Sequence, residues 1–437
     1  MKLNTPKTIK NNLKRLKRAI FDNREKIYEA LYQDLGKNKI ESELTEIAPV
    51  ISEINLYIKK VNKWSKNKNV STPLKLFPAK SYYAHEPLGN VLVISPWNYP
   101  FNLTMIPFVN AYGAGNKVIL KPSELAPKTS LLVKEILEGI FNKEEIEVHL
   151  GGPEVVEEIF AKKLDFVMFT GSERVGKIIY KKAAEKMIPC LMELGGKTPT
   201  IVAYSADIED TALKIVWGKM LNQGQTCVAP DYIYVHKEKK DELIEAINFA
   251  YDYISNLAET DQFDAFAKVI NKNHVNRIQG LSNKITFNNE KTKMHLLLEE
   301  ATWNSKSMQD EIFAPILPIL TFEEVDEIVK ELDEKANPLA MYVFSRNNIE
   351  IKYLVENVKC GNVMINDAVT FLSNQNLGFG GVGSSGFGKY QGYEGFKTFS
   401  HFKPVVNKRL WFKEKLRYQV FGKNDKFLKL FKKFISK

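Results

Sequence analysis

The sequence predicts an α/β protein built around doubly wound parallel sheets, and two observations predict this fold class. From residue 91 onward, short apolar runs alternate with longer segments of helical periodicity. This alternation is typical of βαβ units, in which helices cover both faces of a parallel sheet and its strands become almost continuously apolar. The chain has 437 residues, of which 44% are hydrophobic, so it can form two or three domains with full cores.

Helices are expected before this alternation begins. Residues 7–66 are predicted to form two or three amphipathic helices, for example over 19–35 and 41–64, because apolar residues recur there at helical spacing. Prolines interrupt the next stretch, 71–86, whose composition favours β-structure.

A first round of alternating elements predicts a nucleotide-binding type of layer. Its expected strands are 91–95, 118–121, 146–150, 165–170 and 198–203. Its expected helices are 101–113, 129–141, 154–161 and 172–186.

A second round predicts a second α/β domain. Its expected helices are 209–221, 239–254, 325–334 and 349–357, with a further helical stretch over 263–281. Its expected strands are 232–235, 285–287, 316–321, 341–345 and 362–366. We therefore expect three parts: 1–205 with the N-terminal helices and the nucleotide-binding domain, 206–395 as the second domain, and 396–437 as a C-terminal arm and tail.

The net charge of +10 lies entirely at the C-terminal end. Residues 403–437 contain 12 lysines and arginines but only two acidic residues, which leaves 50 basic and 50 acidic residues in the rest of the chain. A protein whose body binds nucleic acid would carry its positive charge on that body. The distribution therefore argues against a nucleic-acid partner.

Cysteine and histidine usage indicates a reducing compartment and no metal. The three cysteines are Cys190, Cys227 and Cys360, an odd number that provides no disulfide framework and favours a cytoplasmic location. The six histidines are isolated, and no Cys/His pair has the spacing of metal ligands. No apolar run has the length of a signal-peptide core at the N-terminus or of a membrane span elsewhere.

Three segments have features of phosphate-binding loops. Residues 171–177 fit G-x-x-x-x-G-K after an expected strand, but Ile178 stands where a nucleoside-triphosphate site needs Ser or Thr to hold magnesium. The segment can still hold one phosphate group or a ribose-phosphate edge, or it is an ordinary capped helix start. Residues 378–383 spell G-x-G-x-x-G without a following helix, which favours a backbone-dense loop near a site over a dinucleotide fingerprint. Residues 121–124, K-P-S-E, end an expected strand, where ligands bind in open parallel sheets, although charged residues there are often merely solvated.

Three polar residues are candidates for catalysis. Cys227 follows G-Q-T, and a cysteine is a strong nucleophile when its thiol ionises, although many free cysteines are inert and buried. Glu193 opens E-L-G-G-K, where a partly apolar turn can raise its pKa and make it a general base, unless it simply pairs with Lys197. Asn98 follows an expected strand, where its amide can stabilise an oxyanion or cap a turn.

Together these segments resemble the aldehyde dehydrogenase superfamily, most closely its class 3, the branch that includes fatty and aromatic aldehyde dehydrogenases. The resemblance rests on motifs that occur in the family's order over about residues 10–405: I-S-P-W-N-Y-P-F at 94–101, K-P-S-E at 121–124, F-T-G-S-E-R-V-G-K at 169–177, L-M-E-L-G-G-K-T-P at 191–199, N-Q-G-Q-T-C-V-A-P-D-Y at 222–232, E-I-F-A-P-I-L-P at 311–318, N-P-L-A at 337–340 and F-G-G-V-G-S-S-G-F-G-K-Y at 379–390. It implies a Rossmann-type NAD-binding domain, a second α/β domain carrying the catalytic cysteine, and a C-terminal oligomerisation arm.

The resemblance also implies a mechanism. Cys227 would attack the aldehyde carbon, the Asn98 amide and the Cys227 backbone N–H would hold the oxyanion of the thiohemiacetal, and Glu193 would activate water against the later thioester. The implied NAD contacts are Trp97, Lys121, Ser123, Glu124, Gly171, Ser172, Val175, Gly176, Glu311 and Phe313. Tyr99 and Thr226 would line the substrate pocket. Glu124 would repel a 2′-phosphate, which favours NAD, although class 3 relatives often accept NADP as well.

The sequence departs from the family pattern in two places. Before F-G-G the family usually has proline, but here Leu377 and Gly378 precede it, which leaves that wall of the substrate pocket open to question. Residues 284–302 lack the family's usual G-G and P-T dipeptides, so we expect an altered surface strand there and unchanged chemistry.

The last residues suggest a second role. Within 427–435, phenylalanine, leucine and isoleucine recur at helical spacing with lysines between them, the pattern of a helix at a membrane surface. The leading hypothesis is an NAD-dependent dehydrogenase of medium-chain, long-chain or aromatic aldehydes, in the cytoplasm and as a homodimer. The alternative is a non-catalytic protein that binds membrane surfaces on the same scaffold, and docking of the tail on a partner subunit is a third interpretation.

Overall fold

The computed structural model describes residues 4–257, 262–411, 418, 421 and 425–435. It divides into two compact units, one formed by 1–65 with 86–401 and the other by 66–85 with 402–437. The first unit contains two six-stranded sheets, and the second contains the three-stranded sheet β1-β2-β15.

The first sheet is the expected nucleotide-binding layer. Its strand order is β14-β7-β6-β3-β4-β5, and all neighbours are parallel except β14 and β7. The strands are β3 (Asn90–Ile94), β4 (Lys117–Lys121), β5 (Ile146–Val148), β6 (Phe166–Thr170), β7 (Cys190–Glu193) and β14 (Gly386–Phe387). The helices between them are α5 (Asn102–Gly113), α6 (Pro127–Glu138), α7 (Pro153–Phe160) and α8 (Glu173–Glu185). Because β3, β4 and β6 are parallel neighbours, the turns that follow them lie at the same edge of the sheet.

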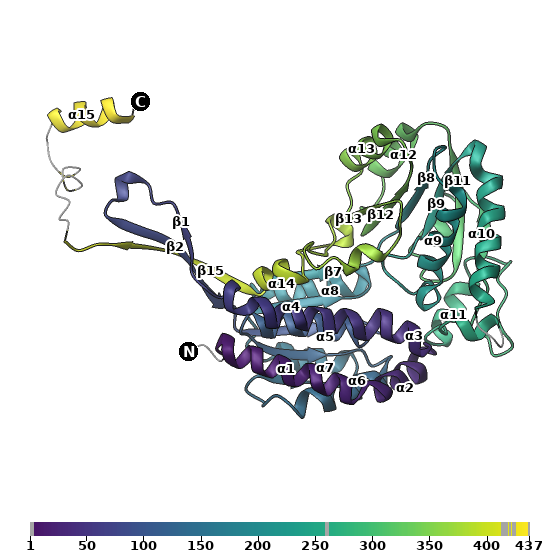
Figure 1. The fold of residues 1–437 in the computed structure, drawn as a ribbon, viewed down its shortest axis with the longest axis horizontal. Helices are drawn as coiled ribbons and strands as arrows, with labels where there is room; N and C mark the ends of the chain where they lie inside the picture. Colours follow the sequence, from purple (N-terminus) through teal and green to yellow (C-terminus); the bar gives the residue numbers. More distant parts are fainter. Residues whose placement is uncertain (1–3, 258–261, 412–417, 419–420, 422–424, 436–437) are drawn as a thin grey trace. The chain divides into compact units, whose positions relative to one another are not determined.

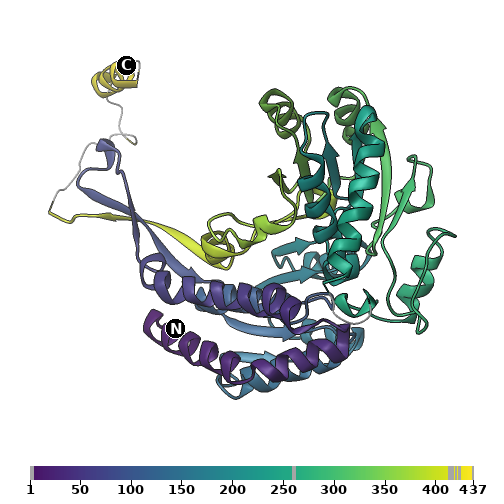
Figure 2. The same cartoon turned by 45° about the vertical axis from the view of Figure 1, so that its right-hand side comes forward.

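The second sheet is entirely parallel, with the order β10-β11-β9-β8-β12-β13. Its strands are β8 (Pro199–Val202), β9 (Tyr232–His236), β10 (Leu297–Glu300), β11 (Ile316–Phe322), β12 (Ala340–Phe344) and β13 (Asn362–Ile365). Its helices are α9 (Ile208–Met220), α10 (Lys240–Ser255), α11 (Lys272–Gln279), α12 (Val325–Asp333) and α13 (Asn348–Asn357). Figure 2 shows the teal helices α9 and α10 packed side by side along this sheet.

The N-terminal helices cover the first unit. They are α1 (Pro6–Asp22), α2 (Arg24–Leu35), α3 (Lys39–Ser42) and α4 (Ala48–Trp64), with one π-helical turn, η1 (Glu43–Ile47), before α4. Figure 1 shows α1 and α4 lying near α5, with which both make contact. The helix expected over 19–35 is divided at Asn23, whose backbone leaves the helical region while its side-chain amide caps the Ala19 carbonyl.

The second unit consists of β1 (Lys68–Val70), β2 (Ala79–Pro87) and β15 (Ser400–Lys408), together with helix α15 (Asp425–Ile435). α14 (Gly392–Thr398) precedes β15 in the chain. The helix expected over 427–435 is therefore present, but the side chains of Phe427, Phe431, Phe434 and Ile435 lie outside the described residues.

Three local predictions differ from the structure. The strand β7 was not predicted, because its four residues are too short to show a period. Only α11 and a short 3-10 turn occupy the stretch expected to be helical over 263–281, since the backbone N–H groups of Lys268 and Val269 bond the carbonyls of Leu35 and Thr292 instead. Residues 285–287 form no strand, although Phe287 makes an isolated bridge with Met294, and the edge strand is β10.

Two strands pair in a sheet on the other side of the domain boundary expected at residues 205 and 206. β8 lies before residue 205 but pairs in the second sheet, and β14 lies after residue 206 but pairs with β7 in the first. The three-part division remains a proposal, and the sheets show that the chain crosses between the layers more than once.

Candidate active site

Asn98 lies in the turn between β3 and α5, at the carboxyl edge of the first sheet. Only 4% of its surface is exposed. Its side-chain amide donates to the Gln225 carbonyl at 2.9 Å, and its own carbonyl accepts from the Asn222 amide at 2.7 Å. The turn after β3 is thus fixed directly against the loop that leads to Cys227.

That loop has an unusual backbone. Asn222 and Gln223 have φ values of 52° and 56°, and Gly224 follows with 71°. A side chain on Gly224 would place its first carbon 2.7 Å from the Ala314 carbonyl oxygen, so a glycine is needed there. The glutamines hold the loop in place: Gln223 exchanges hydrogen bonds with the Met294 backbone, and Gln225 bonds the backbone of Lys268 and Ile270. The Q-G-Q segment therefore positions the cysteine.

Cys227, at the end of this loop, has a free thiol, and the residue as a whole is half-buried. Burial of the sulfur raises the pKa of the Cys227 thiol far above its usual value, and the negative charges of Glu311 and Glu193 raise it further. The backbone N–H groups of Cys227 and Val228 oppose the rise. The thiol is thus protonated at neutral pH in this form of the protein and needs a proton acceptor or a nearby positive charge to become a nucleophile.

Glu193 ends β7 and is 2% exposed. Neither carboxylate oxygen makes a hydrogen bond of ordinary geometry within the described part of the chain. Burial raises the pKa of Glu193 well above its usual range, although the nearby Gly381 backbone N–H opposes the rise. A buried carboxyl with a raised pKa is a stronger base, once ionised, than an exposed one, as a general base requires.

The competing interpretation of Glu193 as a partner of Lys197 is wrong. The Lys197 ammonium instead pairs with Asp231 and donates to the Ser307 and Asp310 carbonyls at 2.9 and 3.0 Å. The second oxygen of Asp231 accepts from the Ile312 backbone N–H at 3.0 Å. Lys197 and Asp231 therefore fix the segment around Glu311.

Glu311 and Phe313 lie on this segment, opposite the two glycines of E-L-G-G-K. Burial and the charge of Asp231 raise the pKa of Glu311 to about 8. One of its carboxylate oxygens is buried and makes no hydrogen bond to the residues that the structure describes, and a side chain on Gly195 would place its first carbon 2.1 Å from the other. Phe313 has a φ of 50°, and its ring makes an edge contact with Trp97 at 5.7 Å between centroids. Arg277 on α11 holds the segment by donating to the Ile312 carbonyl at 2.8 Å.

The remaining candidates for cofactor contact surround the carboxyl edge of the first sheet. Lys121 ends β4, and its ammonium is 2.8 Å from a carboxylate oxygen of Glu124. Ser123 between them is buried, and its hydroxyl accepts from the Leu125 N–H at 3.2 Å. After β6, the Ser172 hydroxyl caps α8 by accepting from the Val175 N–H at 3.5 Å. β4 and β6 flank β3, so these groups lie along one edge of the sheet.

The site fits a dinucleotide on structural grounds. Gly171 and Gly176 let the start of α8 pack closely on the sheet, because added side chains would place their first carbons 2.6 Å from Phe169 and 2.5 Å from Leu194. The 13-residue helix α8 points its N-terminus to this edge, where unpaired N–H groups favour a phosphate. The partnerless oxygen of Glu311 is a ready acceptor for a ribose hydroxyl.

Tyr99 and Thr226, the residues expected in the substrate pocket, contact one another. Both are buried, and their hydroxyl oxygens are 2.6 Å apart. Tyr99 comes from the Asn98 turn and Thr226 from the cysteine loop. Their bond is a second link between the two catalytic segments.

Sequence reasoning did not identify several charged residues of the site. Lys37 and Glu46 are fully buried next to Asn98, Glu41 binds the Asn222 backbone, and Lys219 is fully buried on α9 without a partner among the described residues. In the sequence these residues look like ordinary polar positions of amphipathic helices. No local signal distinguishes them, because their partners are supplied by distant segments.

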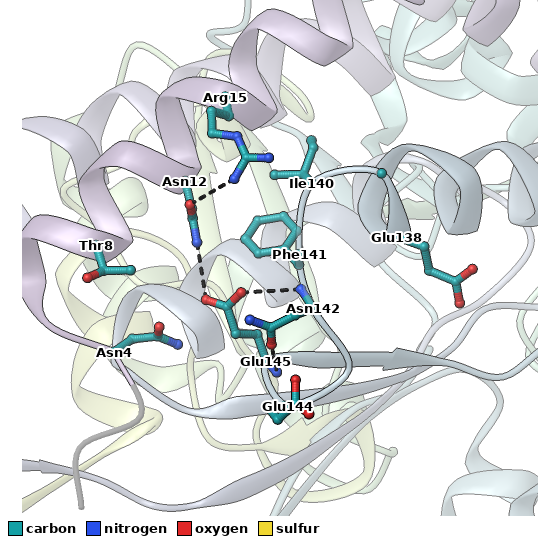
Figure 3. Close-up of a pocket in the computed structure, with 11 residues that line it drawn as sticks. Asn4, Thr8, Asn12, Arg15, Glu138, Ile140, Phe141, Asn142, Glu144 and Glu145 are labelled. Carbon is teal, nitrogen blue, oxygen red and sulfur yellow. Dashed lines mark hydrogen bonds between the residues drawn. The ribbon is translucent and has the colours of Figure 1, made fainter.

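A separate cavity lies away from the candidate site. It has a volume of about 640 Å³ and is lined by α1 residues, including Asn12 and Arg15, and by the segment before β5 (Figure 3). Asn12, Tyr112 and Glu145 bond one another there. Because the segment precedes β5, this cavity is at the amino edge of the sheet, opposite the candidate site. Within the part of the chain that the structure describes, no cluster of metal-ligating side chains occurs, and no helix is both long and apolar enough to cross a bilayer.

Comparison with known proteins gives consistent matches. The model of the aldehyde dehydrogenase family matches residues 1–405. A 4,4′-diaponeurosporen-aldehyde dehydrogenase from Staphylococcus aureus is 40% identical over 433 residues, which are 97% of this chain and 94% of that protein. A mouse protein named aldehyde dehydrogenase, dimeric NADP-preferring, is 36% identical over 416 residues, which are 93% of this chain and 91% of that protein.

A solved structure matches the fold over nearly the whole chain. The substrate-bound structure of a Staphylococcus aureus AldH has a TM-score of 0.94 and 38% identity, and the match covers 98% of this chain and 95% of that one.

Proposed function

The chain belongs to the aldehyde dehydrogenase family, and from this premise we propose how its own residues oxidise an aldehyde. As a member it is an oxidoreductase with the aldehyde dehydrogenase fold, and the family uses NAD or NADP. The observation that carries the proposal is the meeting of three groups from separate elements. Asn98 after β3 bonds the loop of Cys227, and the charge of Glu193 at the end of β7 acts on the Cys227 thiol.

Cys227 is the proposed nucleophile. Its sulfur attacks the aldehyde carbon, and the thiol proton leaves to a nearby base as the thiohemiacetal forms. The carbonyl oxygen becomes an oxyanion, which the Asn98 side-chain amide and the Cys227 backbone N–H stabilise as donors. The hydrogen bonds from Lys37 and Asn222 to the Asn98 carbonyl hold this donor in place.

Glu193 is the proposed base for the second half of the reaction. Loss of a hydride from the thiohemiacetal carbon, to the acceptor that a bound cofactor would supply, leaves a thioester on Cys227. The ionised carboxyl of Glu193 then takes a proton from water, whose oxygen attacks the thioester carbon. The carboxylic acid leaves, and the Cys227 sulfur takes back a proton to restore the thiol. The raised pKa of Glu193 suits this role, because the ionised carboxyl then binds a proton from water more strongly than an exposed carboxylate does.

The cofactor contacts are proposed residue by residue. Lys121, Ser123 and Glu124 would hold the adenosine ribose, whereas Gly171, Ser172, Val175 and Gly176 would hold the pyrophosphate and adenine edge. Glu311, Phe313 and Trp97 would hold the nicotinamide end, where the bound cofactor supplies the hydride acceptor. We propose NAD as the preferred cofactor because the Glu124 carboxylate repels a 2′-phosphate, with NADP as an open alternative.

We propose medium-chain, long-chain or aromatic aldehydes as substrates. Aromatic side chains beside the nucleophile support this class. The Tyr342 hydroxyl donates to the carbonyl of Val228, the residue after Cys227. The Phe371 ring lies 6.5 Å from Tyr342 and 6.2 Å from Phe379 between ring centroids. A panel of aldehydes of increasing chain length, each supplied with NAD and with NADP, tests the proposal, and a kcat/KM that falls as the chain lengthens would contradict it.

The decisive test of the mechanism is Cys227→Ala. The unmodified enzyme is expected to produce reduced cofactor, measured by its near-ultraviolet absorbance, when aldehyde and NAD are supplied. Cys227→Ala is expected to lose this signal, while Cys190→Ala, which changes a cysteine on β7 away from the proposed chemistry, should retain it. Substantial turnover by Cys227→Ala would overturn the assignment.

A homodimer and a membrane contact are proposed for the second unit. β15 pairs on one side only in the sheet β1-β2-β15, and Val406, Leu410 and Trp411 are exposed on or beside it, as expected of an edge that receives a second copy. Sedimentation of the full chain tests the dimer, and a monomer at micromolar concentration would contradict it.

α15 carries exposed lysines at 426, 429, 432 and 433, which suit an anionic lipid surface. Since the family assignment makes the chain an enzyme, membrane contact is proposed beside catalysis and not in its place, and the cytoplasmic location remains a prediction.

A further inference from the structure

A fully buried ion pair lies next to the turn that carries Asn98. The Lys37 ammonium is 2.6 Å from a carboxylate oxygen of Glu46, and both side chains have 0% exposure. Lys37 lies between α2 and α3, and Glu46 belongs to the π-helical turn η1. Neither residue contacts Cys227 or Glu193 through any hydrogen bond of the described structure, so the proposed mechanism gives the pair no chemical role.

Both members of the pair bind the same turn. The Lys37 ammonium donates to the Asn98 carbonyl at 3.1 Å. The other carboxylate oxygen of Glu46 accepts from the backbone N–H groups of Phe101 and Asn102 at 3.1 and 2.8 Å. The pair therefore holds the turn at both ends, from the carbonyl of Asn98 to the first residues of α5.

Lys37 also contacts the substrate-side residue of the turn. Its ammonium is 3.8 Å from the centroid of the Tyr99 ring, within the range of a cation–π interaction. Tyr99 in turn bonds Thr226, the residue before the nucleophile. A single cation is thus linked to both the oxyanion donor and the cysteine loop.

The same N-terminal segment holds the second catalytic loop. A carboxylate oxygen of Glu41 accepts from the Asn222 backbone N–H at 2.6 Å, where the backbone has the left-handed φ of 52°. The Asn222 amide donates to the same Asn98 carbonyl that Lys37 binds. Lys37, Glu41 and Glu46 therefore contact the Asn98 turn and the cysteine loop together. π-helical turns such as η1 occur often at functional sites.

Burying two charges requires their desolvation, which apolar side chains of similar size do not require. Stability alone therefore does not explain why an ion pair lies here. The directional hydrogen bonds that the pair makes to the Asn98 turn do explain it. We propose that Lys37 and Glu46 are positioning residues that fix the Asn98 amide for the oxyanion and thereby speed the first chemical step. This inference rests on the proposed function of Asn98.

The experiment is a double-mutant cycle on the first turnover. The variants are Lys37→Met, Asn98→Ala and their combination, together with Lys37→Met/Glu46→Gln, which removes both charges and leaves no unpaired carboxylate if the single variant folds poorly. Lys39→Met is the matched control, because Lys39 pairs with Glu25 on the surface at 71% and 74% exposure. The rate and the amplitude of the burst of reduced NAD are measured with saturating NAD and aldehyde, and the amplitude counts correctly folded sites.

Lys37→Met is expected to slow the burst by about 10- to 100-fold, the effect typical of a slightly misplaced catalytic group, with little change in amplitude or in KM for NAD. In the Asn98→Ala background, the same substitution should slow the burst less than about twofold, because the group that Lys37 positions is absent. Lys39→Met should behave as the unmodified enzyme does.

Two results would overturn the inference alone: an unchanged burst rate in Lys37→Met and Lys37→Met/Glu46→Gln, or an equal loss from Lys37→Met with and without Asn98. A loss of amplitude at constant rate would also overturn it, because it would show a purely structural role. If Asn98→Ala itself leaves the burst rate unchanged, the proposed role of Asn98 is wrong. This failure is distinguishable from failure of the inference about Lys37, because it is measured on Asn98→Ala and not on Lys37→Met.

Discussion

The side-chain amide of Asn98 donates a hydrogen bond to the backbone carbonyl of Gln225, with nitrogen and oxygen 2.9 Å apart. The two residues are 127 positions apart in the sequence, and the bond joins the first sheet to the loop that carries the nucleophile. The amide thus lies beside the peptide that precedes Thr226 and Cys227, where an oxyanion on the attacked carbon would form.

Removal of this amide should slow the first half of the reaction. Asn98→Ala is expected to lower the burst rate of reduced NAD by about 100- to 1,000-fold, the usual cost of losing one oxyanion donor. Asn98→Asp should be no better, because a carboxylate offers no donor and repels the oxyanion. Stopped-flow absorbance measures the burst, and a rate within threefold of the unmodified enzyme would show that Asn98 is not the donor.

Replacement of Glu193 should slow the second half of the reaction, hydrolysis of the thioester, and leave the first half unchanged. Glu193→Gln is expected to retain the burst but to lose about 100- to 10,000-fold of the steady-state rate, because the amide cannot take a proton from water. The comparison needs both phases from the same progress curve. Glu173→Gln, a change at an exposed residue of α8 that pairs with Lys177, serves as the control. Equal losses in both phases would argue against Glu193 as the deacylating base.

The charge of Glu311 should be visible in the reactivity of Cys227. A negative charge nearby disfavours the thiolate and so raises the pKa of the thiol, which means that Glu311→Gln should lower that pKa. Because the pKa of Glu311 itself is about 8, the charge is present mainly above pH 8, and the two pH profiles should converge below it. The rate of inactivation by iodoacetamide, measured against pH without cofactor, should be higher for Glu311→Gln above pH 8. Glu323→Gln, at an exposed pair with Lys237, should leave the profile unchanged, and coincident profiles for Glu311→Gln would contradict the prediction.

Cofactor preference should depend on Glu124. Glu124→Gln removes the negative charge that faces the expected 2′-position, so the ratio of kcat/KM for NADP to that for NAD should rise about tenfold, equivalent to about 1.4 kcal/mol. The Lys121 ammonium, now 2.8 Å from the carboxylate, would then be available to the phosphate. Glu138→Gln on the exposed part of α6 is a control for general charge effects. An unchanged ratio would place the determinant of preference elsewhere.

The basic tail should bind anionic vesicles. Deletion of residues 425–437 is expected to reduce co-sedimentation with phosphatidylserine vesicles, and replacing the lysines at 426, 429, 432 and 433 by glutamine should do so as well, since each contributes about 1 kcal/mol near such a surface. Aldehyde oxidation by both variants should remain. Vesicle binding that survives the deletion would remove the membrane proposal.

Local sequence was sufficient for most elements of the two sheets. The strands that become β3, β4, β6, β11 and β12 were predicted within a few residues, because a buried parallel strand needs a run of apolar residues whatever surrounds it. β7 and β10 were not predicted, since short strands acquire their structure from the neighbours with which they pair. The extended backbone at Lys268 has the same cause, because its hydrogen-bond partner is Leu35.

The sequence by itself determined the alternation of the parallel sheets, the family and the position of the basic charge after residue 403. These three properties depend only on which residue types follow one another along the chain. Tertiary structure alone decided that no side chain of the described residues pairs with Glu193 while Lys197 binds Asp231, that β8 belongs to the second sheet, and that Lys37 and Glu46 hold the Asn98 turn. Each of these depends on contacts between distant segments, and the burial that gives those contacts their strength arises only when the chain is folded.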